Sequence, residues 1–120
     1  MDWYKPCAYD DEQKRSFHTT AKRCLKALAN ALGFQPGSFD LRTNAGGIAV
    51  SGEITLHTDH LYVQVSQPAT GADTGVLIRT CKGRKDYTGG RNHFAPLSTL
   101  DRIDVLATLC RAILQEGGPS

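Results

Sequence analysis

The sequence predicts an α+β domain in which a four-stranded antiparallel meander carries an N-terminal and a C-terminal helix on one face, in the order α-β-β-β-β-α. Two observations lead to this prediction. Apolar residues recur at helical spacing near both ends of the chain, and in the middle of the chain they alternate with polar residues. Elements with one apolar side each pack those sides together, so both helices are expected on one side of the sheet. The length of 120 residues suits a single domain, 1–120, with residues 1–9 as a partly ordered arm.

The first helix is predicted over residues 11–32. Asp10 or Asp11 can cap its N-terminus, and Gly33 is typical of a helix end. Pro36 and Gly37 then indicate a turn. The apolar face of this helix comprises Phe17, Ala21, Cys24, Leu25, Leu28 and Leu32.

The middle of the chain predicts four short strands. Phe39 and Leu41 begin the alternation, and residues 44–47 read as a hairpin loop. Residues 57–60, with the sequence HTDH, are expected to form the next turn, and residues 68–75 a longer loop. The last strand is predicted over 76–81. The apolar strand positions of the second and third strands are Ile48, Val50, Ile54, Leu56, Leu61, Val63 and Val65, with Gly52 as a candidate bulge.

The second helix is predicted to begin at Ser98, because Ser98 followed by Asp101 is a variant of the capping box. Its apolar face comprises Leu100, Ile103, Leu106, Ala107, Cys110, Ile113 and Leu114. The order of helix, meander and helix is similar to that of the double-stranded-RNA-binding domain in topology alone. Where that family carries a lysine-rich signature, this chain reads PLSTLDRIDV, with two aspartates and one arginine.

Composition restricts the functional classes. Hydrophobic residues make up 40% of the chain and charged residues 22%, which is typical of a globular protein. No apolar run reaches the roughly 18 residues that span a bilayer. The N-terminus lacks the apolar region of a secretion signal, so a cytoplasmic location is expected, with no membrane partner. The cysteines at 7, 24, 81 and 110 form no closely spaced pair, so we expect free thiols and neither a metal nor a cofactor.

A basic stretch at residues 79–94, RTCKGRKDYTGGRNHF, carries the main functional signal. Its net charge of +4 exceeds the +2 of the whole chain. Its glycines allow a close backbone approach, and Tyr87 offers a stacking surface among arginines. A solvated connector between strand and helix is the simpler interpretation of such a loop. The predicted binding residues are Lys82, Arg84, Lys85, Tyr87, Arg91 and Asn92 of this stretch, and Arg15, Lys22 and Lys26 on the basic side of the first helix.

Two further constellations provide alternatives. His57 and His60 flank Asp59 and could hold a metal, but the polarity of a surface turn explains them better. Cys81 with His93, oriented by Asp86, could form a nucleophilic pair, although a cysteine and a histidine twelve residues apart arise easily by chance.

These observations favour a small intracellular protein that binds rather than catalyses. We expect its partner to be acidic, either a nucleic acid or an acidic protein surface. The alternatives are a cysteine-dependent hydrolase or transferase that uses Cys81 and His93, and a structural subunit without a small ligand. The oligomeric state stays open at this stage.

Overall fold

The computed structural model describes residues 2–3, 5–46, 51–67, 74–83 and 90–117. Helix α1 (Asp11–Ala31) is followed by strands β1 (Phe39–Asn44), β2 (Glu53–Thr58), β3 (Leu61–Ser66), β4 (Val76–Thr80) and β5 (His93–Ala95). A 3₁₀ helix, η2 (Leu97–Asp101), then leads into α2 (Ile103–Gly117). All neighbouring strands pair antiparallel in the order β1-β2-β3-β4-β5. The α+β class, the antiparallel meander and the two helices are therefore confirmed.

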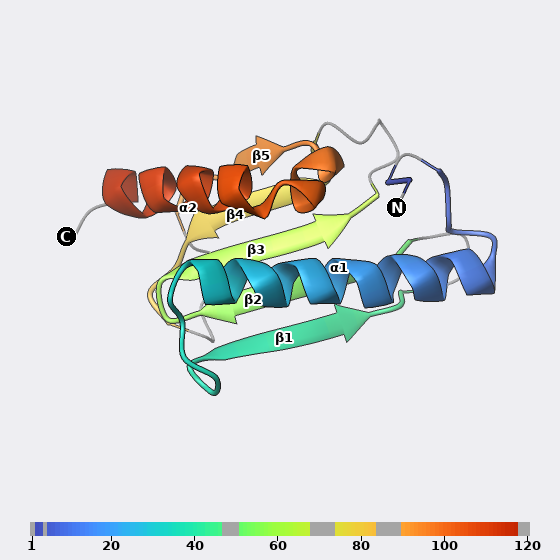
Figure 1. Cartoon of the computed structure of the whole chain (residues 1–120), viewed down its shortest axis with the longest axis horizontal. Helices are drawn as coiled ribbons and strands as arrows, with labels where there is room; N and C mark the ends of the chain where they lie inside the picture. Colours follow the sequence, from blue (N-terminus) through green and yellow to red (C-terminus); the bar gives the residue numbers. More distant parts are fainter. Residues whose placement is uncertain (1, 4, 47–50, 68–73, 84–89, 118–120) are drawn as a thin grey trace.

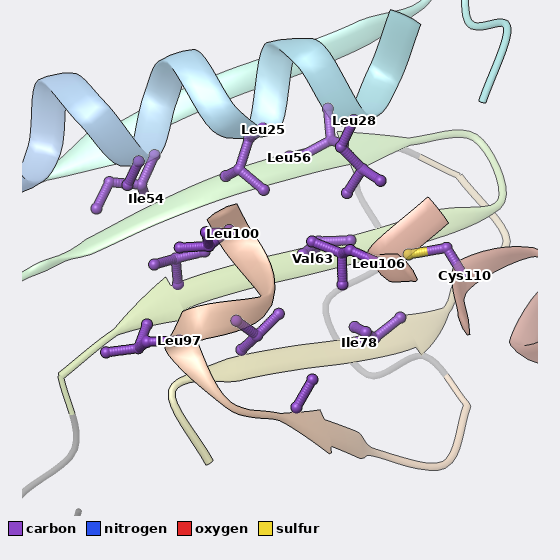
Figure 2. Packing of buried hydrophobic residues seen from close by; sticks show 14 of the residues in the cluster. Leu25, Leu28, Ile54, Leu56, Val63, Ile78, Leu97, Leu100, Leu106 and Cys110 are labelled. Carbon is purple, nitrogen blue, oxygen red and sulfur yellow. The ribbon is translucent and has the colours of Figure 1, made fainter. Parts of the chain in front are cut away.

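Both helices pack on the same side of the sheet, with α1 over β1 and β2 and α2 over β4 (Figure 1). Leu25 and Leu28 of α1 point toward β2, where Leu56 meets them (Figure 2). Leu106 and Cys110 of α2 lie over β3 and β4 (Figure 2). All five of these side chains are fully buried, so burial of their apolar surface supplies much of the driving force for this packing.

Helix α1 has well-defined ends. The Asp10 carboxylate accepts hydrogen bonds from the backbone N–H groups of Glu12 and Gln13, at 3.0 and 3.1 Å, which confirms the predicted cap. At the other end, Gly33 adopts φ +81°, a left-handed conformation that glycine tolerates well. The guanidinium of Arg111 in α2 donates to the carbonyl of Ala31 at 2.7 Å, so α2 satisfies one of the last carbonyls of α1.

Three predicted features of the fold are corrected. The sheet has five strands rather than four, because His93–Ala95 pairs with β4 as β5. The segment after Pro96 is the 3₁₀ helix η2 rather than the start of the second helix, and α2 begins at Ile103. The second strand continues through Thr58, so His57 lies within β2 and not in a turn. The predicted strand positions Ile48 and Val50 lie outside the described residues.

The N-terminal arm is held against the domain. Trp3 and Cys7 are buried in the core, and the Trp3 ring packs edge-on against Phe17 with ring centroids 5.8 Å apart. The Gln67 side chain accepts a hydrogen bond from the Cys7 amide and donates to the carbonyls of Trp3 and Lys5. One glutamine thus fixes the arm at three backbone positions.

Candidate functional site

The face of the sheet opposite α1 and α2, hereafter the helix-free face, carries the main cluster of polar and aromatic side chains. Successive strand residues point to opposite faces, so residues next to the buried Ile54, Leu56 and Ile78 point away from the helices. The strand register places Asp40, His57, Tyr62 and Arg79 directly opposite one another. They form a row across β1, β2, β3 and β4.

His57 lies within this row and is fully buried. Its Nδ1 lies 2.9 Å from a guanidinium nitrogen of Arg42, and its Nε2 lies 2.9 Å from the carbonyl oxygen of Gly83. A guanidinium can only donate and a carbonyl can only accept. Nδ1 must therefore be the unprotonated acceptor, and Nε2 must carry the proton that it donates to Gly83.

The surroundings of His57 favour this neutral form. Removal from water lowers the pKa of His57, and the positive charges of Arg42 and Arg79 lower it further. The Gly83 carbonyl and the Asp40 carboxylate act in the opposite direction without reversing the shift. The hydrogen bond also brings Gly83 of the basic stretch against the helix-free face.

Arg79 and Tyr62 make the next contact along the row. The Arg79 guanidinium carbon lies 4.1 Å from the centre of the Tyr62 ring, which is a cation–π arrangement. The Tyr62 ring also packs edge-on against His57, with centroids 5.0 Å apart. The Tyr62 hydroxyl donates to the Gln64 side-chain oxygen at 2.8 Å. Arg79 is 5% exposed, so this arginine of the basic stretch packs against the sheet instead of facing solvent.

A second row on the same face is more accessible. The register aligns Arg42, Thr55, Gln64, Leu77 and Phe94 across all five strands. Phe94 is 54% exposed, and its cross-strand neighbour Leu77 is half-buried. An aromatic ring therefore lies on the helix-free face at the β5 edge, beside the aliphatic side chain of Leu77, and Gln64 follows in the same row on β3.

The described residues of the predicted loop site flank this face. Lys82 follows β4, whereas Arg91 and Asn92 directly precede β5, and all three are exposed. The Gly90 N–H donates to the Thr80 carbonyl at 2.8 Å and closes the base of the hairpin from which they extend. Arg84, Lys85, Asp86 and Tyr87 lie outside the described residues.

The predicted helix residues lie on the other side of the sheet. Arg15, Lys22 and Lys26 are exposed on α1, which packs against the apolar face. Gly83 contacts His57 on the opposite face. Among the described residues, Gly83 of the basic stretch and the three basic residues of α1 therefore lie on opposite sides of the sheet.

The structure also describes the residues of the two alternative sites, namely the metal site at residues 57–60 and the pair of Cys81 and His93. His57 is engaged by Arg42 and Gly83, whereas Asp59 and His60 are exposed, so the interpretation of His57 as a surface turn residue is wrong. Over the described ranges, no group of three histidine, cysteine or acidic side chains lies close enough to hold a metal. The Cys81 thiol donates to the Thr58 carbonyl at 3.2 Å, whereas the cross-strand partner of His93 is Ile78.

Sequence reasoning missed His57, Arg42 and Arg79 as members of one cluster, and it missed Phe94 as an exposed aromatic. The alternation within the predicted strands places Arg42 and Arg79 on the side opposite the apolar positions, whereas His57 was assigned to a turn and Phe94 belongs to β5, which was not predicted. What that pattern lacks is the register, which decides that Arg79 lies opposite Tyr62 and Phe94 opposite Leu77.

Comparisons of this chain with protein-family models, with curated proteins and with solved structures found no match. Within the part of the chain that the structure describes, neither helix combines the length and the apolar character needed to cross a membrane.

Proposed function

We propose that this protein is a non-catalytic binding protein whose partner is acidic, and that the partner is single-stranded nucleic acid held on the helix-free face beside the 82–92 hairpin. The observation that carries the proposal is Phe94, a half-exposed aromatic ring on a sheet face bordered by a basic hairpin. Proteins that bind single strands combine such stacking surfaces with positive charge along the nucleic-acid backbone.

The charge distribution supports this choice of partner. Lys82 and Arg91 are exposed at the hairpin, and the stretch 79–94 has a net charge of +4. Arg42, with a side chain 39% exposed, adds a further cation on the same face. Asp40 and Glu53 on the same side reduce the local charge, so the positive potential is concentrated toward the hairpin.

The aromatic residue favours a nucleic acid over an acidic protein surface. Every base has a flat face that can stack on a phenyl ring, and each such contact contributes about 1–3 kcal/mol by alanine substitution. The Gln64 amide, which accepts from Tyr62, still has N–H groups to offer to a base edge. An acidic peptide needs the cations but gains little from the exposed phenyl ring.

The enzymatic alternative receives less support from the same geometry. A nucleophilic cysteine needs an adjacent base that can take its proton. The Cys81 thiol donates to the Thr58 carbonyl, and a carbonyl cannot take that role. The basic hairpin and Phe94 then have no part in the chemistry.

The test is a titration with fluorescent single-stranded and duplex oligonucleotides at several salt concentrations. Phe94→Ala is compared with Tyr9→Ala, which removes another highly exposed aromatic ring, 85% exposed, from the N-terminal arm. We expect Phe94→Ala to weaken binding to single strands by about 1–3 kcal/mol and Tyr9→Ala to leave it unchanged.

A second pair of variants locates the electrostatic contribution. Lys82→Ala/Arg91→Ala should weaken binding and reduce the salt slope by roughly 0.7 for each lost phosphate contact with a single strand. Lys22→Ala/Lys26→Ala removes the same number of charges from α1 and should change neither the affinity nor the salt slope. Salt-dependent binding that is insensitive to Phe94→Ala contradicts stacking on Phe94, and absence of binding to either oligonucleotide contradicts the nucleic-acid proposal.

A further inference from the structure

Strand β1 is the longer of the two edges of the sheet. It is six residues long and, within the part of the chain that the structure describes, pairs with β2 alone, whereas the opposite edge strand, β5, has three residues. Figure 1 shows β1 as the outermost strand beneath α1. The outward N–H and C=O groups of an edge strand can pair with another strand.

The side of β1 that faces α1 is incompletely covered. Phe39 and Leu41 are half-buried although they pack against the core, whereas Leu56, the cross-strand partner of Leu41, is fully buried. Phe34, just before the strand, is also half-buried against the core. A further strand along β1 would remove more of this apolar surface from water.

The helix-free side of β1 carries charges that complement themselves. Asp40 and Arg42 flank Leu41 and form a 3.4 Å ion pair, with side chains 46% and 39% exposed. In an antiparallel copy of β1 with its two-fold axis at Leu41, each Asp40 lies opposite the Arg42 of the other copy. The Phe39 side chain then lies opposite Thr43, and Leu41 lies opposite itself.

From this self-complementarity we propose that two copies of the chain associate through antiparallel pairing of their β1 strands about Leu41. The symmetry places each opposite-charge pair in the interface twice, as in other isologous dimers. An unrelated strand would not supply the aspartate and the arginine at matching positions. The occupant that the observations favour is therefore a second copy of this chain.

The arrangement has a structural consequence. Asp40 and Arg42 of both copies lie on one side of the joined sheet, so the two helix-free faces become one continuous surface and all four helices cover the other. The inference stands without the proposed function, because it depends on β1 alone. If both hold, one nucleic-acid strand can contact both copies.

The test uses charge reversal in the full chain, with the oligomeric state measured by sedimentation equilibrium over the micromolar to millimolar range. We expect the parent to form a dimer. Asp40→Arg alone and Arg42→Asp alone each place like charges opposite one another, and each should weaken self-association about tenfold or more. An equimolar mixture of the two variants should form a heterodimer, because every opposed pair is then of opposite charge.

The mixture separates the interface from effects within one chain. Each variant loses its own Asp40–Arg42 ion pair, and Arg42→Asp also loses the hydrogen bond to His57, so only a second copy can restore complementarity. Thermal melts followed by circular dichroism verify that both variants are folded. A monomeric parent, or single variants that dimerise as tightly as the parent, overturns the proposal.

A cross-linking experiment tests the register without changing charge. In a Cys24→Ser background, Leu41→Cys should form an intermolecular disulfide under mild oxidation, because directly opposed Cβ atoms lie about 4.5–5.5 Å apart. Thr43→Cys, opposite Phe39 in the same register, should not. Cross-linking of Thr43→Cys as readily as Leu41→Cys, or of neither variant, contradicts pairing about Leu41.

Discussion

Replacement of His57 by alanine tests the connection between the sheet and the basic hairpin. The imidazole donates to the Gly83 carbonyl, accepts from Arg42 and packs edge-on against Tyr62, and it is fully buried. Loss of the donor to the partly buried Gly83 carbonyl costs roughly 1–3 kcal/mol, and the aromatic contact contributes roughly 0.5–1.5 kcal/mol. His57→Ala should therefore lower the free energy of unfolding by about 2–4 kcal/mol.

The matched control is His60→Ala, which makes the same chemical change three residues away at an exposed position. Surface substitutions of this kind usually stay within about 0.5 kcal/mol of the parent. The assay is urea denaturation of the parent and both variants, followed by circular dichroism. Equal destabilisation by the two variants would refute the special role of the His57 contacts.

The pH dependence of stability gives an independent measure of the same group. Burial lowers the pKa of His57 below its ordinary value, with Arg42 and Arg79 acting in the same direction. The unfolded chain therefore binds a proton at a higher pH than the folded chain does. The contribution of neutral His57 to stability is complete above about pH 6.5 and is lost as the pH falls below this value, by at most about 1.4 kcal/mol per pH unit.

His57→Ala removes this titration while the other histidines and the carboxylates remain. Between about pH 7.5 and pH 5.5, the stability of the parent should therefore fall more steeply than that of the variant. The free energies of unfolding should converge as the pH decreases. If the two pH profiles run parallel, His57 does not have the lowered pKa that its surroundings imply.

Three other predictions concern the core and the backbone. Leu28→Asp and Leu106→Asp each place a carboxylate at a fully buried position, so each should cost several kcal/mol of a total of roughly 5–15 and abolish the cooperative thermal melt. Burial raises the pKa of the Cys110 thiol to about 12, so labelling by iodoacetamide at neutral pH, followed by mass spectrometry, should occur there only after denaturation. Gly52→Ala should lower the free energy of unfolding, measured by urea denaturation, by more than about 1 kcal/mol, because φ is +74° and the added Cβ would collide with the Asn44 carbonyl oxygen.

Only the basic part of the candidate site was accessible from local sequence patterns. Lys82, Arg91 and Asn92 are exposed beside a strand end, as the glycine-rich basic stretch predicted. Their role in binding stays a prediction. Arg79 contributes to the net charge of the same stretch, but its guanidinium packs on the Tyr62 ring. The net charge of a segment does not show which of its charged side chains face solvent.

The ends of α1 and the alternation of the strands were determined by the sequence itself, because capping and side-chain periodicity act over a few neighbouring residues. The start of α2 at Ile103 was not, because the segment after Pro96 forms the 3₁₀ helix η2. Strand β5 was not, since three residues form a strand only when β4 presents its edge to them. His57 was assigned to a turn because HTDH is polar throughout. In the fold, the Thr58 hydroxyl accepts hydrogen bonds from the amides of His60 and Leu61, and the turn comprises only the two residues before β3. His57 therefore belongs to β2. Its burial among Arg42, Tyr62 and Gly83 depends on contacts with other segments of the chain, which the local sequence does not contain.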